Sequence, residues 1–358
     1  MSKLIVEICK IAEIKPILNA DKLELALIKG WQCIVAKGQY KAGDLIVFCP
    51  PDSVIPPNLI EKYKLTFLKK NGKVDSIKLR GEVSQGLILD IPEGIDPKEG
   101  KDVADLMGIT KYEPPERQLG CNTNSNEKPN KNRANLLFKK YTDIENIKNF
   151  PDVFQEGEEV VISEKVHGSN FRASWLPRTP RNILERFINL FKSKYEFVYG
   201  SHNVQKASRN LKKGYYKKDI WLNIVEKYDL INKIPKDYTV YGEIYGDGIQ
   251  DLIYGLKNEI KLVVFDIMYK SRYLDWADKI SFCISLNLPI IPLIYQGVYS
   301  QEIVARCTLG QSLFCSDQIR EGCVITPICE QEHWRIGRKI LKSINVDYLL
   351  RKKATEFH

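Results

Sequence analysis

The stretch 164–171, which reads Glu-Lys-Val-His-Gly-Ser-Asn-Phe, constrains this chain more than any other part of it. An apolar run at 159–163 leads into it and predicts that Lys165 ends a strand. A lysine amine can attack an electrophile and keep the product bound, although a lysine with the ordinary pKa of about 10.4 is almost fully protonated near neutral pH. Burial beside positive charge or a metal ion lowers that pKa. We interpret Lys165 as a candidate nucleophile and Gly168 as room for a ligand to approach the backbone.

The alternative for this stretch is a solvated lysine at the end of a strand. A K-x-x-G pattern fixes only two positions and is common by chance. The choice therefore depends on whether other parts of the chain complete an active site.

The chain carries a surplus of positive charge, +9 from 54 Lys and Arg against 45 Asp and Glu. This surplus indicates a polyanionic partner such as nucleic acid. The basic residues cluster at 128–140, 172–186, 206–218 and 335–353. No apolar run approaches 18 residues, so no membrane span or membrane partner is expected, and the first residues do not resemble a secretory signal.

Nine cysteines are spread along the chain without a C-x-x-C pair. Most of them lie in apolar segments: Cys9, Cys33, Cys49, Cys283 and Cys323. Buried, reduced thiols fit this pattern better than a disulfide framework or a zinc site. The cysteines therefore predict a cytoplasmic or nuclear protein.

Residues 1–112 predict a small closed β structure, because short apolar runs alternate with turn residues. The runs are 4–14, 23–28, 32–35, 45–49, 76–81 and 85–89. A five-stranded OB-type barrel is the first interpretation, and another small β-barrel is the alternative. A short helix is expected near 103–107.

A polar, turn-rich stretch at 113–133 is interpreted as a linker to a second domain at 134–350, which a basic tail at 351–358 follows. A short helix capped by Thr142 or Asp143 and running through Ile147 is expected at the start of this domain. Further helices are predicted at 178–192 (basic and amphipathic), 218–231, 274–286 and 300–309. Strands are predicted at 238–245, 260–268, 323–326 and 336–343.

Three further stretches gain meaning when they are taken with Lys165. Glu243 lies between two glycines in 241–246, and Phe265 and Asp266 lie in the apolar strand 263–267. Glu321 precedes the apolar strand 323–326, and Lys342 follows it. Each stretch alone is weak evidence, and the sequence has neither a P-loop nor a G-x-S-x-G elbow.

In this order, with spacings of 78, 23, 55 and 21 residues, the stretches resemble motifs I, III, IIIa, IV and V of the covalent nucleotidyltransferases. That superfamily includes RNA ligases, DNA ligases and mRNA capping enzymes. The stretch 164–171 is similar to the RNA ligase 2 branch, and a β domain ahead of the motifs resembles the Deinococcus and Naegleria type of RNA ligase. The resemblance implies an α+β fold, with an N-terminal OB-type β-barrel followed by a nucleotidyltransferase domain of antiparallel sheets with flanking helices.

The resemblance also implies an ATP-dependent RNA ligase that joins a 3′-OH end to a 5′-phosphate end. The intermediates would be lysyl-AMP and AMP-capped RNA, the metal would be Mg²⁺ or Mn²⁺, and the process would be RNA repair. Lys165 would be the nucleophile, Lys342 would contact the α-phosphate, and Glu321 would help to bind the metal. The implied nucleotide-binding residues are Glu164 and Phe265 at the adenine, Asn170 and Glu243 at the ribose, and also His167, Asp266 and His202; Glu243 is a second candidate metal ligand.

The chain departs from the family pattern at three positions. The arginine usual in motif Ia is missing from 200–203, where His202 is the stand-in. His167 occupies a position at which some relatives carry aspartate. Lys342 lacks the second lysine of motif V, unless Lys339 substitutes for it.

The expected partners are RNA ends, including nicked RNA or RNA–DNA duplex, and a monomer is expected. One alternative is a DNA ligase or a GTP-using capping enzyme. The other is a catalytically degenerate protein that binds RNA without chemistry, and the departures in motifs Ia and V keep it open.

Overall fold

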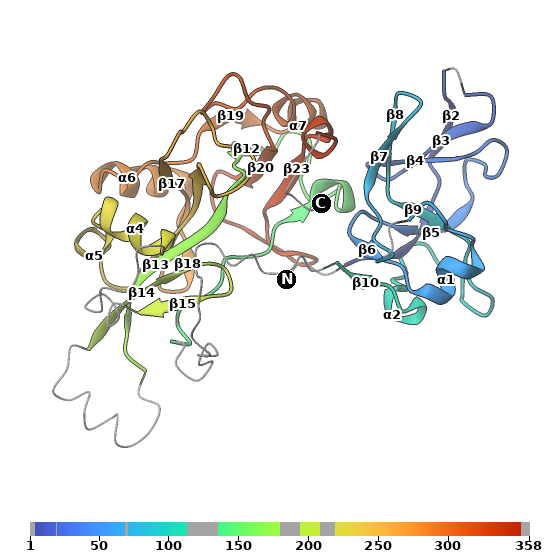
Figure 1. Cartoon of the computed structure of the whole chain (residues 1–358). Helices are drawn as coiled ribbons and strands as arrows, with labels where there is room; N and C mark the ends of the chain where they lie inside the picture. Colours follow the sequence, from blue (N-terminus) through green and yellow to red (C-terminus); the bar gives the residue numbers. More distant parts are fainter. Residues whose placement is uncertain are drawn as a thin grey trace. The chain divides into compact units, whose positions relative to one another are not determined.

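The computed structural model describes residues 4–18, 20–68, 71–112, 135–179, 194–207 and 219–351. Contacts divide the chain into two units (Figure 1). The first contains residues 1–115, 143–154 and 341–358, and the second contains 116–142 and 155–340. These units do not coincide with the predicted domains, because two segments predicted to lie in the second domain group with the N-terminal one. The predicted linker, most of the basic helix 178–192, most of the basic clusters 128–140 and 206–218, and the tail from 352 on lie outside the described residues.

The N-terminal unit consists mainly of short antiparallel strands. One sheet has the order β1 (Glu7–Lys10), β5 (Leu45–Cys49) and β9 (Leu87–Leu89), and another has β2 (Glu13–Pro16), β3 (Leu23–Ile28) and β4 (Trp31–Ala36). Two strand pairs complete it: β7 (Ser76–Leu79) with β8 (Glu82–Gln85), and β6 (Ser53–Val54) with β10 (Thr110–Lys111). The apolar run 4–14 contains β1 and the start of β2, because the chain passes from the first sheet to the second there.

Helices are short in this unit. The structure has α2 (Ala104–Met107) where a helix was predicted, and Gly108 ends it with a φ of +65°. The sequence did not predict α1 (Pro57–Lys62).

The helix predicted from Thr142 or Asp143 through Ile147 is wrong. The chain is extended there and forms β11 (Glu145–Asn146), which pairs in parallel with β23 (Leu341–Ile344). Asn146 then caps a 3₁₀ turn at Ile147–Asn149, and α8 (Val346–Leu349) follows β23. A partner strand almost 200 residues away in sequence outweighed the local helix signal, which no local pattern can reveal.

The second unit is built around a six-stranded antiparallel sheet (Figure 1). Its order is β15 (Gln205–Ala207), β14 (Tyr195–Gly200), β13 (Ser169–Pro177), β16 (Tyr238–Gly246), β17 (Ile260–Tyr269) and β18 (Arg272–Tyr273). The core lies between one face of this sheet and the helices α4 (Ile220–Lys227), α5 (Leu230–Lys233) and α6 (Trp276–Ser285). The helix predicted at 218–231 is divided into α4 and α5, because Asp229 has a φ of +53°.

A second group of strands in this unit surrounds β12 (Glu159–Lys165), which pairs with β19 (Leu293–Val298) on one side and β20 (Gly322–Pro327) on the other. The helix α7 (Gln301–Thr308) contacts β20 and begins at the predicted cap, Ser300, whose hydroxyl accepts a hydrogen bond from the Ile303 amide. The strand predicted at 336–343 is interrupted, because Gly337–Arg338 pairs as β22 with β21 (Glu332–His333) before β23 starts.

Eight cysteines lie in the described part of the chain, and all of them are free thiols. The five that the sequence placed in apolar segments are buried. Within the described residues, no helix has both the length and the apolar character needed to cross a membrane.

Candidate active site

Lys165 is the last residue of β12, and its position follows from the pairing of this strand with β20. Glu164 lies opposite Cys323, and Lys165 lies opposite Gly322. The residue before Gly322 is Glu321, so the strand register brings two residues that are 156 positions apart into contact. The Lys165 ammonium forms a salt bridge with the carboxylate of Glu321, which is almost fully buried, while about a quarter of the lysine side chain stays exposed.

Glu164 points to the opposite side of β12 from Lys165, as strand alternation requires. Its side chain is buried, and its Oε2 accepts a hydrogen bond from the Leu313 amide at 2.8 Å. Burial raises the pKa of Glu164, and the hydrogen bonds from Ser312 and Leu313 oppose that rise. Glu164 is therefore held from the 312–313 segment and has little freedom to move.

The loop after β12 is held by the segment that follows β16. The His167 amide donates to the Tyr254 hydroxyl at 2.7 Å, and Nε2 of His167 lies 2.6 Å from Oδ1 of Asp251. Gln250 donates to the Gly168 carbonyl at 3.2 Å. His167 is fully buried, so its imidazole serves as part of the support of the loop that carries Lys165.

Gly168 corrects the sequence interpretation. A Cβ at this position would lie 2.2 Å from the Ile244 carbonyl oxygen and 2.8 Å from Cγ of Glu243. The room that the missing side chain leaves is filled by β16, so the glycine lets two strands approach each other and does not admit a ligand to the backbone.

Asn170 and Glu243, 73 residues apart in sequence, lie directly opposite each other on β13 and β16. Their neighbours Phe171 and Ile244 belong to the core under the helices. Because side chains alternate along a strand, Asn170 and Glu243 lie on the other face of the sheet. The register thus brings two predicted ribose-binding residues together on the face that the helices do not cover.

A β-bulge places Phe265 and Asp266 on that same face. Tyr241 pairs with Asp266 and Gly242 pairs with Val264, so β17 has one residue more than β16 at this point. Val264 and Ile267 both lie in the core, which leaves the two residues between them on the other face. An extra residue of this kind redirects side chains, and here it displays the Phe265 ring, which is only half-buried.

Asp266 is the centre of a buried network. Its carboxylate lies 2.6 Å from Nη1 of Arg338 and 3.5 Å from Nζ of Lys279, and it accepts a hydrogen bond from the Tyr141 hydroxyl at 2.8 Å. Burial by itself would raise the pKa of Asp266, but Arg338 and Lys279 outweigh it and hold that pKa below its usual range. The Tyr141 ring then meets the Phe265 ring edge-on, with centroids 4.8 Å apart.

The motif Ia region is organised by a buried arginine. The Arg172 guanidinium donates to the carbonyls of Phe138, Ser201 and His202 at 2.6, 2.9 and 3.3 Å. It also lies over the Phe138 ring, 4.0 Å from its centroid, and burial lowers the pKa of Arg172 to about 10. His202 is thus placed through its backbone, in the turn between β14 and β15.

Lys342 lies on β23, opposite Asn146 of β11, and contacts place both residues in the N-terminal unit. Its charge acts on Asp52, where it lowers the carboxyl pKa against the larger effect of burial. Lys339, the possible substitute, belongs to the second unit and forms a salt bridge with Glu158.

The predicted metal ligands are Glu321 and Glu243. The described residues contain no group of three or more His, Cys, Asp or Glu side chains arranged to hold a metal ion. Burial raises the pKa of Tyr254 well above its usual range, and Glu321, Glu164 and Glu243 raise it further. Three carboxylates therefore act on one hydroxyl, and a cation bound to Glu321 or Glu243 would need further oxygen ligands from substrate and water.

Sequence reasoning missed the residues that position the predicted ones. Tyr254, Asp251, Tyr141 and Arg338 all contact or support a predicted site residue, yet none was itself predicted as a site residue. Their one local signal in the sequence is a polar residue close to apolar ones. That signal is weak, because such residues are usually exposed or paired for structural reasons.

Comparison with known proteins now defines the class. A family model of RNA ligases matches residues 158–344, and a family model of an OB-fold domain matches residues 5–91. The first match covers more than half of the chain, which therefore belongs to the RNA ligase family. No curated protein matches the sequence.

Solved structures of Naegleria gruberi RNA ligase are similar to this chain over nearly its whole length. The complex with PPi is 23% identical, with 97% of this chain and 98% of that chain covered and a TM-score of 0.72. A lysine-to-methionine mutant with AMP and Mn is 23% identical, with 96% and 98% covered and a TM-score of 0.74. A lysine-to-alanine mutant with ATP and Mn is 22% identical, with 96% and 98% covered and a TM-score of 0.73. The predicted fold class, an OB domain followed by a ligase domain of mainly antiparallel sheets, is confirmed.

Proposed function

We propose that this protein is an ATP-dependent RNA ligase that seals a 3′-OH to a 5′-phosphate end through lysyl-AMP and AMP-capped RNA. The observation that carries the proposal is the position of Lys165. It ends β12 beside the buried Glu321, in the segment that runs directly into the Asn170 and Glu243 pair. The membership of the RNA ligase family and the ATP and AMP complexes of the similar Naegleria ligase support it.

Lys165 attacks the α-phosphorus, and the leaving group is pyrophosphate, so one N–P bond forms as one P–O bond breaks. Phe265 stacks on the adenine, with Tyr141 packed against its edge. Asn170 and Glu243 bind the ribose, and Lys342 stabilises negative charge at the α-phosphate.

Four residues act through position. Glu164, held by the Leu313 amide, limits the adenine pocket. His167 supports the loop through Asp251 and Tyr254. Asp266 orients Tyr141 and Arg338, and His202 belongs to the turn that Arg172 holds.

Divalent metal chemistry fits the carboxylates near Lys165. Glu321 and Glu243 offer the hard oxygen ligands that Mg²⁺ and Mn²⁺ prefer, together with substrate phosphates and water. When bound, such a cation offsets the phosphate charge and favours the free amine of a neighbouring lysine. Glu321 meanwhile keeps Nζ of Lys165 close to where the α-phosphate must lie.

We further propose the domain division 1–112, 113–133 and 134–350, with the first domain and the basic clusters binding RNA, in RNA repair and as a monomer. Backbone contacts by lysine and arginine predict binding that weakens with salt and depends little on base sequence.

The test is covalent labelling with α-labelled ATP or GTP and Mg²⁺ or Mn²⁺, followed by a denaturing gel. A labelled band from ATP that is lost in Lys165→Ala is expected. Labelling by GTP alone would indicate capping chemistry. If folded protein gave no label with either nucleotide while it still bound RNA, the non-catalytic RNA-binding protein would replace the ligase.

A further inference from the structure

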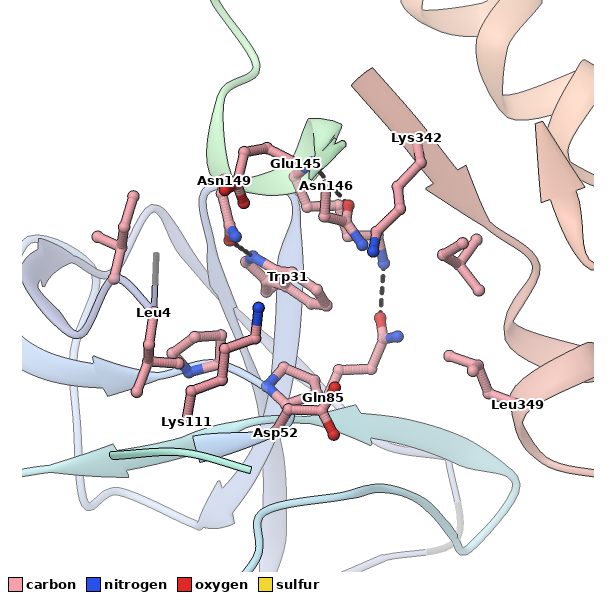
Figure 2. Close-up of a pocket in the computed structure, with 15 residues that line it drawn as sticks. Leu4, Trp31, Asp52, Gln85, Lys111, Glu145, Asn146, Asn149, Lys342 and Leu349 are labelled. Carbon is pink, nitrogen blue, oxygen red and sulfur yellow. Dashed lines mark hydrogen bonds between the residues drawn. The ribbon is translucent and has the colours of Figure 1, made fainter. Parts of the chain in front are cut away.

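The N-terminal unit contains a pocket of about 60 Å³, and Lys342 is the one residue of its lining to which the proposed reaction gives a role (Figure 2). The barrel contributes Trp31, Asp52, Gln85 and Lys111, and the segments that group with it contribute Glu145, Asn146, Lys148, Asn149 and Lys342. The labelled side chains of Lys111 and Lys342 extend toward the space beside Trp31 and Gln85 in Figure 2. Three lysines thus line one small hollow.

Lys148 is half-buried in this hollow, where its ammonium contacts an amide oxygen and an aromatic ring. Its Nζ donates to Oε1 of Gln85 at 2.6 Å and lies 4.9 Å from the centroid of the Trp31 ring. Trp31 is fixed in turn, because its Nε1 donates to Oδ1 of Asn149 at 2.8 Å. Burial lowers the pKa of Lys148 to about 8. An amide oxygen and an aromatic ring only partly replace the hydration that the buried ammonium has lost.

The acidic residues of the lining do not balance the lysines. Asp52 lies 3.0 Å from Nζ of Lys73, which is itself buried and also lies 2.9 Å from Asp75. With Lys73 and Asp75 included, the lining has four lysines against the three carboxylates of Asp52, Asp75 and Glu145, a net charge of +1. The pocket therefore has a surplus of positive charge and is suited to an anion.

The size of the pocket restricts the anion. A water molecule needs roughly 10–15 Å³ of such volume, so the pocket holds roughly four to six atoms of that size. A phosphoryl group with its bridging oxygen has five heavy atoms, whereas a nucleobase has more and needs a flat slot. We propose that this pocket binds a phosphoryl group of the substrate, from the RNA backbone or RNA end or from the nucleotide, with Lys148 as its central ligand.

This assignment rests on the proposed function for the identity of the substrate, but its test does not require ligation. Two variants change the charge at Lys148 in different ways. Lys148→Met keeps most of the length of the side chain and removes the charge. Gln85→Glu changes one atom and gives the ammonium a carboxylate partner within hydrogen-bond distance, so that an internal anion competes with the ligand.

Two further variants serve as controls. Lys148→Arg keeps the charge and is expected to keep most of the binding. Lys41→Met removes an exposed lysine of the same unit that does not line the pocket. Thermal melting of each protein establishes that it is folded, and Gln85→Glu decides the question if Lys148→Met does not fold.

The first readout is fluorescence anisotropy of a labelled, 5′-monophosphorylated RNA, titrated at several salt concentrations. If the phosphoryl group belongs to RNA, both variants bind at least about fivefold more weakly, and the slope of log K against log salt falls by roughly 0.7–0.9, the value of one contact. Lys41→Met should match the unchanged protein.

The second readout is the ATP concentration that gives half-maximal covalent labelling. If the phosphoryl group belongs to the nucleotide, this concentration rises in both variants while RNA affinity stays the same. If both variants match the unchanged protein in RNA affinity, salt slope and ATP dependence, the pocket is not a phosphoryl site. A protein that never labels would refute the proposed ligase, whereas the RNA titration would still decide the pocket.

Discussion

Lys165 and Lys148 are two lysines withdrawn from water in different units, and their surroundings differ in one respect. Lys165 contacts the carboxylate of Glu321, while Lys148 contacts an amide oxygen and an indole ring. The second unit contains another pairing of cations with a carboxylate at Asp266, which contacts both Arg338 and Lys279. Among the residues that the structure describes, the N-terminal pocket offers Lys148 no carboxylate contact of this kind.

The difference shows how two lysines can serve two purposes. A carboxylate partner holds a lysine at one place and stabilises its charge, as Glu321 does for Lys165, the proposed nucleophile. A lysine without such a partner costs stability until an anion binds, which makes it suited to recognition. The following predictions separate these two cases, starting with the largest effect.

Lys165→Ala should reduce covalent labelling by ATP at least about a thousandfold, because the attacking amine is lost. Lys165→Arg should be equally inactive, since a guanidinium stays protonated at any working pH. Gel labelling with α-labelled ATP measures this, with Lys41→Met as the matched control. Label that persisted in Lys165→Ala would transfer the nucleophile's role to another residue.

Arg338→Met should lower the free energy of unfolding by about 3–5 kcal/mol, because it leaves Asp266 buried without its closest cation. Chemical denaturation of the variant measures the loss. The double variant with Asp266→Asn and Arg338→Met should lose much less unfolding free energy than the sum of the losses in the two single variants. Additive costs would mean that the pair does not interact.

Glu321→Gln should lower the rate of covalent labelling about tenfold to a hundredfold, since the carboxylate that positions Lys165 and offers a metal ligand is replaced by an amide. The rate should be measured across a range of Mn²⁺ concentrations. A shift to higher metal requirement would support a metal role, and an unchanged rate would leave the salt bridge without function in this step.

Lys148→Met should raise the free energy of unfolding by about 1–3 kcal/mol at pH 7, whereas Arg338→Met lowers it. A lysine whose pKa is lower in the folded protein, about 8, than in the unfolded chain costs stability while it is protonated. The cost is complete below pH 8 and disappears as the pH rises toward about 10.4. The difference in unfolding free energy between the two proteins should therefore shrink between pH 7 and pH 10. A difference that did not change with pH would show that Lys148 is not the group responsible.

Much of the fold was readable in the sequence, wherever local patterns agree with the tertiary structure. The strands β16 and β17 and the helices α6 and α7 lie where apolar periodicity and the Ser300 cap placed them. The failures have tertiary causes. Residues 142–147 are extended because β11 pairs with β23, and 218–231 is two helices because Asp229 adopts a positive φ.

The sequence by itself determined the chemical groups: a lysine at a strand end, carboxylates at 243, 266 and 321, and the order that marks an RNA ligase. Only the tertiary structure decided which of them meet. The strand register joins Lys165 to Glu321, a bulge puts Phe265 and Asp266 on one face, and the packing of 143–154 against the barrel creates the Lys148 pocket. The physical reason is that local sequence fixes which side of a strand a residue faces, whereas the neighbour across the sheet depends on pairing between distant segments.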